Sequence, residues 1–134
     1  MMKILQPPGW ARPKGYSNGI AVKGGTTVFV AGQISFNSQN IIEDKTFAGQ
    51  FRQTLKNTLA VLAEAGARPE HIVRMTWYVT DKKEYLGAIV DVGAAYRELI
   101  GKHYPAMAVV QVAGLMEDAA KLEIETTAVV PDAA

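Results

Sequence analysis

One glutamate near the C-terminus has the setting of a proton-transfer group. Glu123 stands between Leu122 and Ile124, in a stretch where apolar and polar residues alternate. In a β-strand this alternation sends the carboxylate to the face opposite the two apolar side chains. A partly buried carboxylate can act there as both acid and base. Residue type alone favours the simpler alternative, a solvated or ion-paired glutamate on a strand.

Two other residues have the features of ligand contacts. Tyr16 offers a hydroxyl that could hold a substrate or a water, although a packing aromatic residue is nearly as good an explanation. Gly32 follows Ala31 within an expected strand. A glycine there lets a ligand approach the backbone, whose N–H could bind charged oxygens. A β-bulge or close strand packing would also explain Gly32.

The composition excludes several other chemistries. The 134 residues include no cysteine, which rules out disulfides, thiolate catalysis and cysteine-based metal sites. His71 and His103, the two histidines, lack a metal-ligand spacing, and Gly24-Gly25 is too short for a phosphate-binding loop. A net charge of +1 without a basic patch argues against nucleic acid and membranes as partners. Met1–Trp10 lacks a long apolar run, so we expect no signal peptide or membrane span and a cytoplasmic location.

The first residues are predicted to be extended. Pro7, Pro8 and Pro13 exclude a helix from residues 1–15, because proline lacks a backbone donor and restricts the residue before it. This arm should lie over the surface of a single domain that spans residues 1–134.

Two amphipathic helices are predicted, and a glycine follows each of them. Thr46–Ala65 and Lys83–Ile100 each place apolar residues three or four positions apart, which gives one apolar stripe per helix. Gly66 and Gly101 follow as C-terminal glycines.

Five strands are predicted around these helices. Gly24-Gly25 separates the first two and is typical of a hairpin turn. The order of elements indicates a sheet with both helices on one face, and the other face keeps apolar residues that copies of the chain could bury. The strands are Gly19–Val22, Thr26–Ile34, Ile72–Val79, Ala108–Val112 and Lys121–Val130.

Several segments in this order resemble the RidA (YjgF-type) family, from about Lys14 to Val130. The resemblance implies an α+β, chorismate-mutase-like fold, with a mixed β-sheet and two helices on one face. It also implies a homotrimer with a central barrel and a cleft between each pair of subunits. The segments are Lys14–Gly19, Val30–Ile34, Gln53–Gly66, Val73–Asp81, Pro105-Ala106 and Glu123-Ile124-Glu125.

Family members of the deaminase type hydrolyse enamines and imines released by pyridoxal-phosphate enzymes, and they need no cofactor and no metal. An imine carbon is electrophilic once its nitrogen is protonated, so the protein has only to hold the carboxylate, position a water and move a proton. The resemblance implies that Glu123 handles the water and that Tyr16 lies at the cleft.

The chain departs from the family pattern at three positions. Met107 aligns with the arginine that grips the substrate carboxylate, and methionine has no donor. Ala31 stands where serine is common and Val109 where some members have cysteine, so the cleft should be more apolar. Gly93 falls where some members have asparagine, from which no conclusion follows. Another cation could replace the arginine: the candidates are Arg12, Lys14, Lys102 and His103.

These departures favour a changed substrate or a lost activity. The first hypothesis is an enamine or imine deaminase, a hydrolase acting on a small, unsaturated or aromatic-derived amino acid, with aminomuconate-type substrates as one possibility. The alternative is a trimer of the same family that binds a small metabolite without turnover. A ribonuclease or translation inhibitor is less favoured, because the net charge is close to zero.

Overall fold

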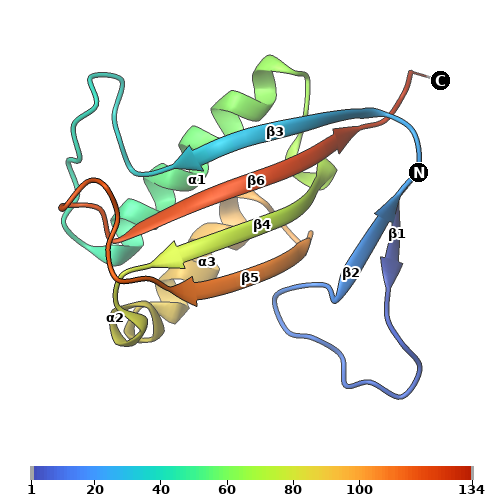
Figure 1. The fold of residues 1–134 in the computed structure, drawn as a ribbon, viewed down its shortest axis with the longest axis horizontal. Coiled ribbons are helices and arrows are strands. Elements are labelled where there is room, and N and C mark those ends of the chain that lie inside the picture. The colour runs from blue at the N-terminus through green and yellow to red at the C-terminus, as the bar shows by residue number, and fades with distance from the viewer. Residues whose placement is uncertain (1, 134) are drawn as a thin grey trace.

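A mixed sheet of four strands supports the rest of the structure (Figure 1). The computed structural model describes residues 2–133, so Met1 and Ala134, the outermost residues of the expected arm and domain, lie outside the described part. In spatial order the strands are β3 (Thr26–Gln33), β6 (Leu122–Val130), β4 (Ile72–Val79) and β5 (Ala106–Gln111). β6 pairs antiparallel with β3 and β4, whereas β5 runs parallel to β4. The predicted α+β class with a mixed sheet is therefore confirmed.

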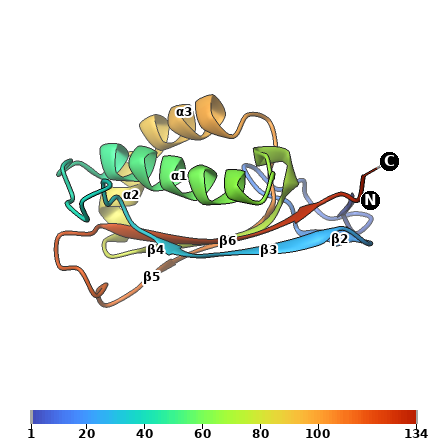
Figure 2. The same ribbon diagram turned by 90° about the horizontal axis from the view of Figure 1, so that it is seen from above.

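Helices α1 (Phe47–Glu64) and α3 (Ile89–Leu99) lie on one face of this sheet, as the element pattern predicted (Figure 2). The apolar stripe of α1 faces the strands, and Phe51, Leu55 and Leu62 have no exposed surface. Burying each of these side chains contributes roughly 1.5–3 kcal/mol. The side chain of Thr46 accepts the N–H of Gly49 and so caps the helix where the sequence indicated its start. A short 3₁₀ helix, Pro69–His71, then leads into β4.

The second predicted helix is broken into two. One residue, Ala88, separates α2 (Lys82–Gly87) from α3, and it has φ −101° and ψ 7°. Asp81 caps α2 by accepting the N–H groups of Lys83 and Glu84. The apolar spacing of the sequence continues across the break. Tyr85 of α2 accordingly still contacts the ring of Phe47, with 5.7 Å between the two centroids. The period alone therefore did not indicate the turn.

The predicted hairpin is wrong. β2 (Gly19–Val22) pairs with β1 (Met2–Leu5) in a separate two-stranded sheet, and β3 pairs with β6 instead. Gly24 and Gly25 do adopt positive φ, 73° and 82°, but they join two sheets rather than two paired strands. A left-handed backbone can connect two different sheets as well as the two strands of a hairpin. Residues 2–5 take the place of β3 as the strand that pairs with β2. This part of the expected arm is therefore paired.

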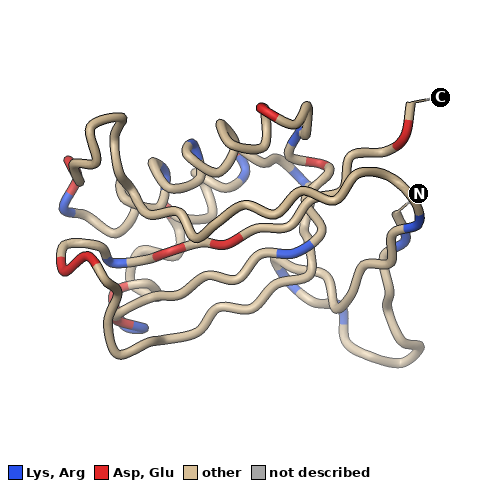
Figure 3. Tube along the Cα trace, turned by 45° about the horizontal axis from the view of Figure 1, so that its top comes forward, with Lys and Arg blue, Asp and Glu red and all other residues tan. Residues whose placement is uncertain are grey.

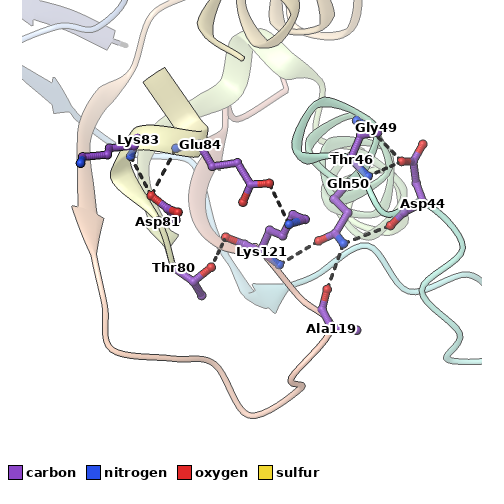
Figure 4. Close-up of polar contacts among 10 residues, drawn as sticks. All are labelled: Asp44, Thr46, Gly49, Gln50, Thr80, Asp81, Lys83, Glu84, Ala119 and Lys121. Carbon is purple, nitrogen blue, oxygen red and sulfur yellow. Dashed lines mark hydrogen bonds and ion pairs between the residues drawn. The ribbon is translucent and has the colours of Figure 1, made fainter. Parts of the chain in front are cut away.

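A buried glutamine fixes the beginning of β6 (Figure 4). The amide nitrogen of Gln50, on α1, donates to the carbonyl oxygens of Asp44 and Ala119, each at 3.0 Å. Its oxygen accepts the backbone N–H of Lys121 at 2.8 Å. The ammonium of Lys121 also reaches a carboxylate oxygen of Glu84 on α2 at 2.8 Å. Since Glu123 follows two residues later, these contacts fix the strand that carries it.

Replacing the buried glutamine should loosen this end of the sheet. Gln50→Leu keeps the volume but leaves two carbonyl groups and one N–H without their partner, so the free energy of unfolding should fall by about 2–4 kcal/mol. Denaturant titration measures this. Gln53→Leu, on the same helix, is the control, because Gln53 bonds only to Asn57 one turn away. Equal losses in both variants would mean that the contacts to the β6 loop are unimportant.

Candidate functional site

The six candidate residues fall into two groups. Tyr16, Met107 and Val109 line one cavity beside β5. Ala31, Gly32 and Glu123 lie by contrast on β3 and β6. The first group faces the helices and the second group faces away from them, so each is described separately.

The first group belongs to a cavity of about 400 Å³ between the edge of the sheet and α3. This volume is in the range of small-molecule sites. Met107 and Val109 project into it from β5, because Met107 is in register with buried Met75 and Val109 with buried Trp77. Met107 and Val109 therefore form an apolar wall of this cavity, and its role as the wall of a substrate cleft stays a prediction.

Tyr16 reaches this cavity because the next residue is tied to the chain before β5. The backbone N–H of Ser17 donates to the carbonyl of Pro105 at 3.0 Å, and its hydroxyl donates to the carbonyl of Tyr104 at 2.5 Å. Ser17 also forms a parallel bridge with Ala106. These contacts bring the N-terminal segment to the β5 edge, where Tyr16 keeps 41% of its surface exposed.

Aromatic rings line the cavity. The Trp77 ring is 6.2 Å from that of Tyr96 and 6.4 Å from that of Tyr85, and Tyr96 stacks on Tyr104 at 5.8 Å. Burial raises the pKa of Tyr96 and of Tyr85, so both hydroxyls keep their protons at neutral pH. The buried indole N–H of Trp77 has no acceptor among residues 2–133. The cavity can therefore accommodate a flat apolar group and has few polar contacts to offer it.

Two cations line this cavity, and only one was foreseen. Lys14 was among the expected replacements for the missing guanidinium, but Arg97 of α3 was not. The other three expected cations, Arg12, Lys102 and His103, line a separate cavity of about 240 Å³ that also contacts Tyr16. Arg97 follows Gly93 by four residues, and that spacing was the available sequence signal.

The second group centres on a contact between Gly32 and Glu123. A Cβ atom on residue 32 would collide with the Glu123 carboxylate, coming 2.8 Å from its Cδ. The carboxylate therefore fills the space above Gly32, where the register of β3 shifts between Val30 and Gln33. The alternative explanation, a β-bulge or close packing, agrees with this register shift and with the approach of Glu123, whereas binding of a ligand at Gly32 stays a prediction.

Glu123 lies on the open face of the sheet, as its alternation with Leu122 and Ile124 predicted. Both neighbours are buried, whereas Glu123 is partly exposed and its carboxylate accepts no hydrogen bond from residues 2–133. Its cross-strand neighbour is Tyr78, whose hydroxyl donates to Glu125 at 2.5 Å. That hydrogen bond raises the pKa of Tyr78 and keeps the phenol protonated. Glu123 is thus the free carboxylate in this cluster.

The two groups do not meet within one chain. Met107 and Val109 lie on β5, and Ala31 and Gly32 on β3, and these strands form opposite edges of the sheet. Ala31 lines a different hollow, of about 400 Å³, together with residues of the open face such as Phe29 and Arg74. One folded chain therefore holds these two groups of residues apart.

The charged residues of the described chain are mixed in sign. Lys and Arg are interspersed with Asp and Glu along the trace, without a long run of one sign (Figure 3). Among residues 2–133, no group of three or more His, Asp or Glu side chains could hold a metal ion. None of the helices in this range is both long and apolar enough to cross a membrane.

Comparison with known proteins identifies the family. The family model described as "Endoribonuclease L-PSP" matches residues 10–130. Because this match covers most of the chain, the protein belongs to that family, which is the RidA (YjgF) family that the sequence motifs resembled.

Relatives and solved structures agree with this assignment. A protein of Escherichia coli (strain K12) described as "Putative reactive intermediate deaminase TdcF" is 33% identical over 96% of this chain and 98% of its own length. The 2-iminobutanoate/2-iminopropanoate deaminase of the same strain is 33% identical over 78% of this chain and 80% of its own. Among crystal structures, YyfB of Yersinia pestis, from the conserved Rid family, is 29% identical with a TM-score of 0.83, covering 96% of this chain and 98% of that one. The YjgF gene product of Escherichia coli is 34% identical with a TM-score of 0.67, over 85% and 87%.

A methyl group on residue 32 should displace the nearby carboxylate. Gly32→Ala forces the Glu123 side chain aside, and because that side chain is flexible, the free energy of unfolding should change by less than about 1 kcal/mol. A crystal structure and a denaturant titration of the variant test this. Gly114→Ala is the control, since nothing lies within 4 Å of the added atom. An unmoved carboxylate would show that the space above residue 32 is not restricted.

Proposed function

We propose that this protein is a RidA-type hydrolase that converts the imine or enamine of an amino acid to a 2-oxo acid and ammonia. The names of the two Escherichia coli relatives support the reaction class. The observation that carries the proposal is Glu123, a carboxylate that accepts no hydrogen bond from the described residues and lies against Gly32.

The reaction needs little from the protein. An enamine first gains a proton on carbon and becomes an iminium ion, whose carbon is open to attack. A water then forms a C–O bond to that carbon while Glu123 takes one of its protons. Glu123 passes this proton to the nitrogen and then accepts the proton of the new hydroxyl as the C–N bond breaks, so that ammonia leaves and the carbonyl forms. Tyr16 and the backbone N–H of Gly32 would hold the substrate during these steps.

We further propose that the two groups of residues are half-sites that come together between subunits of a homotrimer. The edge strands β3 and β5 each have one strand partner in the main sheet, and beyond the bridge between Ser17 and Ala106 both edges are open to a second copy. The open face also exposes apolar surface, including Phe29 at 79% exposure. When the β5 edge of one subunit packs against the open face of the next, the aromatic cavity and Glu123 would form one cleft.

The substrate that fits this cleft differs from the smallest imino acids. The thioether of Met107 donates no hydrogen bond and cannot form a two-pronged contact with a carboxylate. The surrounding wall is apolar and aromatic, which favours a substrate with a larger, flat or unsaturated body.

Wild-type protein should therefore accelerate the hydrolysis of 2-iminopropanoate little or not at all. Met107→Arg should raise that rate about tenfold or more, since a guanidinium at residue 107 could form a charge-assisted pair with the carboxylate. Ammonia release from freshly generated 2-iminopropanoate measures both. Met116→Arg is the matched control, because Met116 is 99% exposed. Equal rates in all three proteins would mean that the cleft serves another purpose.

Removing the proposed acid–base group should stop turnover. Glu123→Ala should lower kcat for an imine derived from an aromatic amino acid by about 100-fold or more, without loss of the trimer. Glu117→Ala, on an exposed loop, is the control. Light scattering should give a mass three times 14.5 kDa for each variant. A monomer, or full turnover without Glu123, would contradict the proposal.

A mixing experiment tests whether the site lies between subunits. Val109→Asp should disable the aromatic cavity by placing a negative charge beside the substrate carboxylate. Trimers assembled from Glu123→Ala and Val109→Asp subunits should regain turnover, because some clefts receive both intact half-sites. Mixtures as inactive as either parent would contradict a cleft that takes the two groups from different subunits.

A further inference from the structure

We propose that Arg97, on α3, binds the carboxylate of the ligand in the aromatic cavity, and that Gly93 makes room for its guanidinium. This inference rests on the proposed function only in expecting a carboxylate ligand. It assigns the cation that Met107 cannot supply to a residue on the helix wall of the same cavity.

The first argument is the contact between Arg97 and the helix backbone. Residues four positions apart lie on the same face of a helix. A Cβ atom on Gly93 would be 3.2 Å from Nη1 of Arg97, closer than an ordinary carbon contact. The guanidinium therefore lies directly over the backbone at residue 93, and both residues line the cavity. Any larger residue at position 93 would push the charge away.

The second argument is that Arg97 has no partner within the described chain. Arg52 pairs with Glu98 at 2.6 Å and Arg68 pairs with Glu70 at 3.1 Å. Arg97, next to Glu98 in sequence, forms no ion pair and donates no hydrogen bond to any residue from 2 to 133. Its donors remain available, and their planar fork matches a carboxylate.

The third argument is the cost of the glycine. A glycine inside a helix is less favourable than alanine by roughly 1 kcal/mol, and Gly93 lies in the middle of α3 without a positive φ. Backbone conformation therefore does not require it. The close approach of Arg97 explains why position 93 has no side chain. Gly87 has no such explanation, because nothing lies within 4 Å of a Cβ atom added there.

The rest of the cavity limits the ligand to one negative charge and a flat apolar body. Tyr85 and Tyr96 are neutral, and the other wall residues are mainly aromatic or aliphatic. Lys14 is the second cation at the rim, but it lies in a stretch without helix or strand, whereas Arg97 is held on a helix. A side chain with a fixed base loses less freedom when it binds.

Phenylacetate and phenylacetamide are matched probes, because they share size and ring but differ in charge. In NMR titrations, Arg97→Met should weaken phenylacetate binding roughly 10- to 100-fold and change phenylacetamide binding little. Arg97→Lys should keep part of the affinity. Arg68→Met is the control for loss of an exposed arginine. If Lys14→Met weakens phenylacetate binding and Arg97→Met does not, the assignment is overturned.

The glycine gives an independent test with two readouts of opposite sign. Gly93→Ala should raise the midpoint of thermal unfolding, because alanine favours the helix, and yet weaken phenylacetate binding, because it displaces the guanidinium. Gly87→Ala should leave binding unchanged. Unaltered binding in Gly93→Ala together with unaltered binding in Arg97→Met would overturn the proposal.

Turnover separates this inference from the proposed function. With an imine generated from phenylalanine by an amino-acid oxidase, Arg97→Met should raise KM far more than it lowers kcat, whereas Glu123→Ala lowers kcat. Adding Met107→Arg to Arg97→Met should restore phenylacetate binding, because both positions face one cavity. Binding that depends on Arg97 without any turnover would refute the deaminase and leave the carboxylate site standing. Turnover with an unchanged KM in Arg97→Met would refute the site and leave the deaminase standing.

Discussion

The alternation of side chains along the strands is the constraint on which the candidate site depends. The helices bury one face of the sheet, so β5 turns Met107 and Val109 toward them, while β6 turns Glu123 to the open face. The sheet order adds a second separation, because β5 and β3 are opposite edges. No side-chain movement within one chain can join the two groups. The proposed homotrimer would bring them together from two copies of the chain.

Under the proposed function, the aromatic cavity would offer a cation to the carboxylate of the ligand although residue 107 is a methionine. A charged side chain that lines a cavity can come from any of the strands or helices around that cavity. Here the strand position carries the thioether of Met107, and the helix wall carries the guanidinium of Arg97 over Gly93. A cation on the helix wall in place of the strand would change where the charged end of a ligand lies, and therefore the shape of the ligand that fits.

The regular elements were predictable because their signals are local. The stripe on α1, the approximate range of that helix and the boundaries of β4 follow from periods of 3.6 and 2 residues. The pairing of Gly19–Val22 was not predictable, because positive φ at Gly24 and Gly25 is compatible with a hairpin and with a corner. The break at Ala88 was missed for a similar reason, since the apolar spacing continues through it.

By itself the sequence determined the family, the mixed sheet beneath two helical segments, and the face on which Glu123 lies. These depend on residue order and on short periods. Only the tertiary structure decided that Lys14 and Arg97, and not Arg12, line the aromatic cavity, and that Glu123 covers Gly32. Such neighbours are set by how distant segments pack, and the spacing of residues along a chain contains no direct record of distances through space.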